Sequence, residues 1–172
     1  MIMSPMPKQE KVEPFIQATI DTFKTMAHLD VDRGEIKPMD LQDTCQDVSG
    51  AIELSGMAEG SVTLGLPKLT AMAVACSFLR ASGVSKQLMA DAIGELVNII
   101  AGHAKKDIPD LDIEISLPKV VIGEKHEISS HSDARKLVVF FDSPVGKFHL
   151  VVHLDRQFGD SGLDPVLLEE MW

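Results

Sequence analysis

Apolar residues recur at helical spacing in two long segments of the chain, residues 12–28 and 85–107. Successive residues of an α-helix are about 100° apart, so residues three and four apart share a face. The pattern therefore predicts two long amphipathic helices. Pro14 suits the first turn of the first helix, and Ser85 is a plausible N-cap for the second. The expected core stripe of the second helix consists of Met89, Ile93, Leu96, Val97, Ile100 and Ala104.

Alternating apolar and polar residues predict strands between and after these helices. Two pairs of strands are separated by turn residues, which indicates two hairpins. A third helix is expected over residues 68–81, and a polar loop that holds His126 and His131 should follow residue 117. The expected strands are residues 35–37 at most, 47–55, 61–66, 112–117, 136–141 and 147–154.

The order of these elements repeats weakly in the two halves of the chain. Each half begins with a long helix, and Gly60-Ser61-Val62-Thr63-Leu64 parallels Gly146-Lys147-Phe148-His149-Leu150 at the return strand of its hairpin. This self-similarity predicts an α+β fold with a duplicated, pseudo-two-fold helix-plus-sheet unit. The two long helices should pack beside each other on a largely antiparallel sheet.

The second long helix presents polar residues opposite its core stripe. Asp91, Glu95, Asn98 and Gly102 gather there, and Ile99 flanks them as an expected exposed apolar contact. Glu95 and Asn98 are three residues apart, so their side chains are neighbours on the helix surface. A glycine inside a helix costs about 1 kcal/mol relative to alanine. Gly102 is easier to explain if a partner must come close there.

Spacing alone does not make this face a site, because most exposed polar residues of a helix are simply solvated. The longer string Gly94-Glu95-Leu96-Val97-Asn98, followed by Ala101-Gly102, is more specific. It resembles the signature helix of the CheC/CheX/FliY family of chemotaxis phosphatases, and the resemblance covers residues 12–154. That family hydrolyses the aspartyl phosphate of CheY-type response regulators.

The resemblance implies one site per chain. CheC-type members can carry a signature pair on both long helices, but Asn98 is the only asparagine in this chain. A single site is the pattern of the CheX branch, whose members act as homodimers. A homodimer is therefore implied by resemblance.

The resemblance also assigns roles to the signature residues. Asn98 would orient the attacking water, and Glu95 would form a salt bridge with a lysine in the phosphorylation pocket of the receiver domain. Asp91, Ile99 and Gly102 are the expected further partner contacts. The protein would need no cofactor or metal of its own, because the Mg²⁺ would belong to the partner.

Two alternatives use the same fold without this chemistry. A receiver-binding adaptor, or phosphate-signal sink, would form the same complex without accelerating dephosphorylation, and the intact Glu95/Asn98 pair argues against it. A structural part of a flagellar switch is the other, since FliY resembles this family. The absence of a further motor-binding domain argues against that second alternative.

Composition narrows the class of partner. The chain has 172 residues, 45% of them hydrophobic, a formal net charge of −10 and a pI near 4.9. Nucleic acid and anionic membranes would be repelled over most of its surface.

The chain has no signal peptide and no run of about 18 apolar residues, so a cytoplasmic protein is expected. Cys45 and Cys76 are isolated, and the histidines lack the spacing of a metal site.

Three segments follow from these patterns: a loose leader over residues 1–11, a single CheX-like phosphatase domain over residues 12–154, and a linker with a short helix over residues 155–172. The last segment holds Trp172, the only tryptophan. Its helix either packs on its own domain or docks on a partner.

Two histidines, His149 and His153, lie on the predicted strand 147–154. They are about 13 Å apart, which is too far to chelate one ion, so they are expected on the polar side of the sheet.

Overall fold

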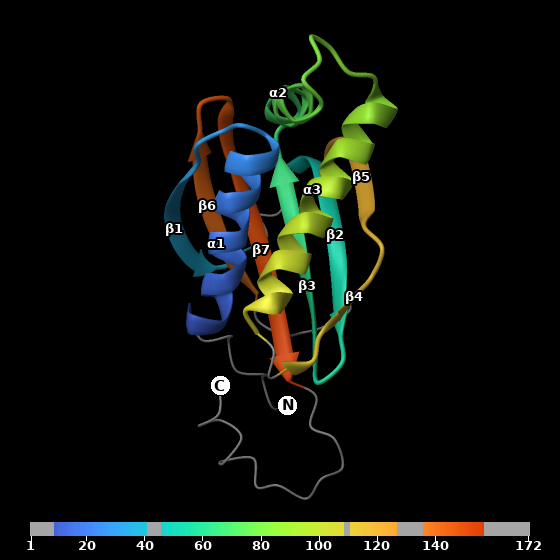
Figure 1. Cartoon of the computed structure of the whole chain (residues 1–172). Helices are drawn as coiled ribbons and strands as arrows, with labels where there is room; N and C mark the ends of the chain where they lie inside the picture. The colour runs from blue at the N-terminus through green and yellow to red at the C-terminus, as the bar shows by residue number, and fades with distance from the viewer. Residues whose placement is uncertain (1–8, 41–45, 109–110, 127–135, 157–172) are drawn as a thin grey trace, which may run out of the picture.

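The computed structural model describes residues 9–40, 46–108, 111–126 and 136–156 (Figure 1). These residues form three helices and seven strands. The helices are α1 (Gln9–Met26), α2 (Lys68–Leu79) and α3 (Lys86–Lys106). The strands are β1 (Asp32–Pro38), β2 (Gln46–Ser55), β3 (Ala58–Leu66), β4 (Glu114–Ile115), β5 (Lys119–His126), β6 (Leu137–Ser143) and β7 (Gly146–Arg156).

One antiparallel sheet carries the helices on a single face. Its strand order is β1-β6-β7-β3-β2, and both β4 and β5 pair with the outer side of β2. The helices α1 and α3 lie side by side across this sheet, whereas α2 sits at one end, near the start of α3 (Figure 1). The α+β fold, with two long helices on a mostly antiparallel sheet, is as the sequence predicts.

The sheet topology supports the predicted duplication. One unit is α1-β1-β2-β3 and the other is α3-β5-β6-β7, and their return strands β3 and β7 pair at the centre of the sheet. The first strand of each unit pairs with the hairpin of the other, since β1 joins β6 and β5 joins β2. Exchanging the two units therefore leaves the strand order unchanged, which is the expected result of a pseudo-two-fold arrangement.

Stacked aromatic rings join α1 to the sheet. The ring of Phe23 on α1 stacks on Phe148 of β7, with centroids 4.6 Å apart, and Phe148 stacks on Phe141 of β6 at 5.2 Å. All three side chains are at most 2% exposed. Aromatic pairs at such distances add about 0.5–1.5 kcal/mol beyond the burial of their area. This cluster therefore helps to hold α1 on the sheet.

Several predicted boundaries differ from the structure. The helix α1 begins at Gln9, before the predicted start, so Pro14 lies inside the helix rather than in its first turn. The strand β1 is longer than expected, and the strand predicted over residues 112–117 is reduced to β4. A full strand, β5, occupies the predicted loop that holds His126. Both β1 and β5 border the hairpins, and their pairing depends on residues far away in sequence.

The prediction that His149 and His153 form a polar side of the sheet is wrong, because both are buried. They are 1% and 7% exposed, and Val151 between them is 4% exposed. The Nδ1 atom of His149 lies 3.3 Å from Nε2 of Gln46. A Cβ atom at Gly65 would come within 2.5 Å of the His149 ring, so the glycine gives this ring its space. Alternation in the sequence separates two faces but does not show that both are covered.

Burial also changes the proton affinity of His153. Desolvation lowers its pKa below the usual value near 6.5, and the neighbouring Lys136 ammonium lowers the pKa further. The Asp155 carboxylate acts in the opposite direction with a smaller effect. Burial likewise lowers the pKa of Lys136. The side chains of Lys136 and His153 therefore lose their protons at a lower pH than they would in water.

No helix among the described residues is long and apolar enough to cross a membrane. Cys76 is half-buried with a free thiol. Cys45, the predicted C-terminal helix and Trp172 lie outside the described residues.

Candidate functional site

The helix α3 has clear local signals at both ends. The Ser85 hydroxyl oxygen caps the first turn by accepting a hydrogen bond from the backbone N–H of Leu88, at 3.1 Å. The last helical residue is Lys106 and Asp107 is the C-cap, close to the predicted end. The last turn carries His103, Lys105 and Lys106. Basic side chains there interact favourably with the helix dipole.

The inner face of α3 is fixed on the sheet. All six residues of the predicted core stripe are at most 4% exposed. The helix also approaches two strands closely through glycines. A Cβ atom at Gly94 would lie 3.2 Å from Val120 of β5, and one at Gly50 of β2 would lie 3.1 Å from Ile93. Such contacts leave the helix little freedom to shift, so its outer face is held in a defined position.

The outer face carries the predicted site residues. Asp91 and Glu95 are exposed, whereas Asn98 and Gly102 are partly exposed. The helix thus brings the Glu95 carboxylate and the Asn98 carboxamide together on one accessible surface, one turn apart. Ile99 is half-buried rather than an exposed apolar contact. Its position next to the core stripe explains this difference.

The two signature side chains are available for a partner. In the described part of the chain, neither Glu95 nor Asn98 makes a side-chain hydrogen bond or an ion pair. Asp91 differs, because its Oδ1 atom accepts a hydrogen bond from Nε2 of Gln87 at 2.8 Å. A Cβ atom at Gly102 would meet nothing within 4 Å. Packing within the described chain therefore does not require glycine at that position.

Leu88 is a surface residue that the sequence patterns did not single out. It lies two turns before Glu95 on the same side of α3, and its side chain is 49% exposed. The helical period could have revealed it, since residues seven apart lie almost in line. Leu88 adds an apolar contact at the start of this outer face.

Among the residues that the structure describes, no group of three or more potential ligands could hold a metal ion. His131 lies outside these residues. The side chains on the outer face of α3 supply two carboxylates and one amide from a single helix. This donor set suits contact with a partner better than a closed metal site. The need for no cofactor of its own stays a prediction.

A family model described as "Chemotaxis phosphatase CheX" matches residues 48–142, which is more than half of the chain and includes all of α3. The chain belongs to the CheX family. The Glu95/Asn98 helix therefore lies within the part of the chain that matches the family. No curated protein matches the sequence.

Solved structures of CheX proteins share the fold of this family member. The chemotaxis protein CheX from Desulfovibrio desulfuricans is 26% identical, with a TM-score of 0.79 over 85% of this chain and 99% of that chain. CheX from Vibrio vulnificus is 25% identical, with a TM-score of 0.76 over 85% and 99% of the two chains.

A more distant structure includes a partner protein. The CheX-CheY-BeF3-Mg complex from Borrelia burgdorferi is 24% identical, with a TM-score of 0.73 over 85% of this chain and 98% of that chain. At this identity the likeness shows the fold alone. The family and the fold are thus established for this CheX family member, while the roles of Glu95, Asn98, Asp91, Ile99 and Gly102 stay predictions.

Proposed function

We propose that this CheX family member hydrolyses the aspartyl phosphate of a CheY-type receiver domain. The observation that carries the proposal is the outer face of α3, where Glu95 and Asn98 lie together without partners among the described residues. The related complex from Borrelia burgdorferi contains CheY with BeF3 and magnesium, which supports a CheY-type partner. Any Mg²⁺ would belong to the receiver.

Asn98 orients the attacking water in this proposal. An acyl phosphate is already reactive toward water, so catalysis requires mainly that the water be held in line with the phosphorus. A carboxamide has both donor and acceptor groups and can fix a water in one orientation. Its partial exposure on a rigid helix allows it to enter the receiver site without a change of fold.

Glu95 positions the helix on the receiver. Its exposed carboxylate can pair with a lysine ammonium of the partner, and a charge-assisted hydrogen bond of this kind fixes the register of an interface. Asp91, Ile99, Gly102 and Leu88 then surround this pair as further contacts. The half-buried Ile99 and the exposed Leu88 supply apolar area on either side.

The direct test incubates the protein with phosphorylated receiver domains from the same organism and follows the loss of phosphate from each receiver. Faster loss for one cognate receiver supports the proposal. Binding without faster loss would instead identify a receiver-binding adaptor, and no binding to any receiver would remove both functions.

Substituting Glu95 with glutamine should weaken receiver binding by about tenfold, or 1.4 kcal/mol. The change keeps the shape of the side chain but removes its charge, so the remaining affinity should depend less on salt. Titration of the receiver at two ionic strengths measures both effects. Glu114→Gln, an exposed glutamate away from α3, is the control. Equal affinities for the two variants would contradict the role of Glu95.

Substituting Gly102 with alanine should stabilise the protein and weaken the complex. Alanine favours a helix by about 1 kcal/mol over glycine, and nothing nearby obstructs its Cβ atom. The added methyl group would nevertheless separate α3 from a receiver that packs closely there. Melting temperature and receiver affinity are measured on the same sample. An increase in both would show that the partner does not approach Gly102.

A homodimer in the cytoplasm is part of the proposal, because the single signature pair is of the CheX type. Light scattering at micromolar concentration tests the dimer. A mass near the 18.7 kDa of one chain would contradict it.

A further inference from the structure

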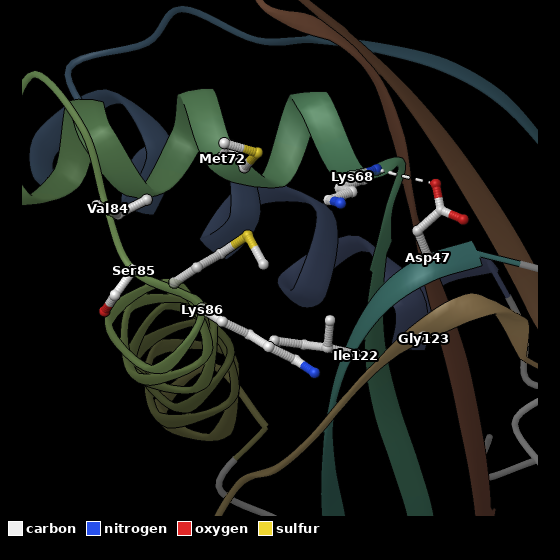
Figure 2. Close-up of a pocket in the computed structure, with 9 residues that line it drawn as sticks. Asp47, Lys68, Met72, Val84, Ser85, Lys86, Ile122 and Gly123 are labelled. Atoms are coloured by element: carbon white, nitrogen blue, oxygen red, sulfur yellow. Dashed lines mark hydrogen bonds between the residues drawn. The ribbon is translucent and has the colours of Figure 1, made fainter.

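A cavity of about 510 Å³ opens where the beginnings of α2 and α3 face β2 and β5 (Figure 2). This volume falls within the range of about 300–1,000 Å³ that is usual for small-molecule sites. Neither Glu95 nor Asn98 lines the cavity, because both lie further along α3. The cavity is thus separate from the proposed receiver site, although both use the same helix.

One part of the cavity wall is apolar. Met72 comes from α2, Val84 precedes α3, Met89 lies in its second turn, and Ile122 comes from β5. Met72 is 36% exposed, so part of this wall faces solvent. Methionine side chains are flexible and polarizable, and they adapt to irregular apolar ligands. The wall therefore suits a flexible hydrocarbon body.

Two lysines border this apolar wall. Lys68 is the first residue of α2 and Lys86 is the first residue of α3, and the Lys86 side chain extends across the cavity toward Ile122 (Figure 2). Within the described part of the chain, neither ammonium group forms an ion pair. The chain as a whole carries a net charge of −10. Two lysines without ion pairs among the described residues, beside one cavity, are therefore unusual for such an acidic protein.

The acidic residue of the lining already has a structural role. The Oδ2 atom of Asp47 accepts a hydrogen bond from the backbone N–H of Lys68 at 3.0 Å, as Figure 2 shows. This bond satisfies one free N–H group at the start of α2, whose N-cap residue is Pro67. The Asp47 carboxylate keeps its charge and offsets one of the two lysines, so the charged side chains of the lining still have a positive sum.

We propose that this cavity binds a small amphipathic carboxylate. The hydrocarbon body lies against Met72, Met89 and Ile122, where its burial removes apolar area from water. The carboxylate lies at the opening, where Lys68 and Lys86 donate charge-assisted hydrogen bonds. A neutral or cationic head group on the same body gains nothing from the two ammonium groups. The proposal does not depend on phosphatase activity.

The test compares three probes that share a ten-carbon chain: decanoate, decanol and decylammonium. Each is titrated into the full-length protein below its micelle concentration, and heat of binding gives the affinity and the number of sites. We expect one decanoate per chain, with affinity at least tenfold above that of the other two probes. Decanol binding as tightly as decanoate, or decanoate failing to bind, would overturn the proposal.

Substitutions in the lining test whether decanoate binds in this cavity. Lys68→Gln combined with Lys86→Gln should lower decanoate affinity at least tenfold, and Met72→Glu should lower it by placing a second carboxylate in the cavity. The control is Lys105→Gln combined with Lys106→Gln, which removes two exposed lysines at the other end of α3. Equal losses in the two double variants would show that overall charge, rather than this cavity, attracts the probe.

Discussion

Replacing Asn98 with alanine should lower the rate of receiver dephosphorylation by about 10²-fold, or 2.7 kcal/mol of barrier. The carboxamide acts mainly in the transition state, where it holds the water in line, so receiver affinity should change little. Asn98 lies on the outer face of α3, away from the buried stripe, and stability should change by no more than about 0.5 kcal/mol. Single-turnover rates, receiver affinity and melting temperature measure the three quantities.

The control for this variant is Asp91→Ala, which truncates a polar side chain two turns earlier on the same face of α3. We expect it to affect affinity more than rate, because Asp91 is a proposed contact without a chemical role. A near-normal rate in folded Asn98→Ala would remove water positioning by this residue. A collapse of its melting temperature would mean that the side chain supports the fold.

Replacing Phe148 with alanine should lower the free energy of unfolding by about 3–5 kcal/mol. This ring is 2% exposed and lies between Phe23 and Phe141, so its removal leaves a cavity between α1 and the sheet. Typical domains have only about 5–15 kcal/mol in total, and the loss would therefore be a large part of it. Urea unfolding measures the change.

Phe140→Ala is the matched control, because Phe140 is only partly buried and lies against Lys37 and His149 rather than in the aromatic stack. It should cost clearly less than Phe148→Ala. Similar losses for the two variants would contradict the view that the stacked rings hold α1 on the sheet.

The candidate site could be predicted because its signals are local. One helix carries both Glu95 and Asn98. Its start after the N-cap Ser85 and its buried stripe follow from capping and the helical period. The face of each residue is then fixed by its spacing alone. The sequence could not show that Ile99 is half-buried, because residues beside a core stripe are covered to different extents by their neighbours.

The border strands and the buried histidines depend on contacts that are distant in sequence. The strand β1 contains little beyond Ile36 that is apolar, yet it pairs with β6 through residues such as Ile36 and Val139. The burial of His149 and His153 depends on what covers their side of the sheet, and the alternation of residues within β7 does not reveal this cover. Periodicity thus identifies faces, while long-range pairing decides their surroundings.

The lysine-bordered cavity had no sequence signal for a similar reason. Lys68 and Lys86 are eighteen positions apart in a chain with many scattered charges, and Asp47 and Ile122 come from still more distant strands. Only the packing of α2 beside the start of α3 brings these residues together (Figure 1). Sites assembled from several elements of this kind require the fold.

The most direct test of the central claim counts the phosphate released from a phosphorylated cognate receiver by a much smaller amount of this protein. Catalysis predicts many phosphates released per protein molecule, at a rate far above that of the receiver alone, and loss of this turnover in Asn98→Ala. Release that stops at about one phosphate per protein molecule, or that never exceeds the rate of the receiver alone, would contradict a phosphatase.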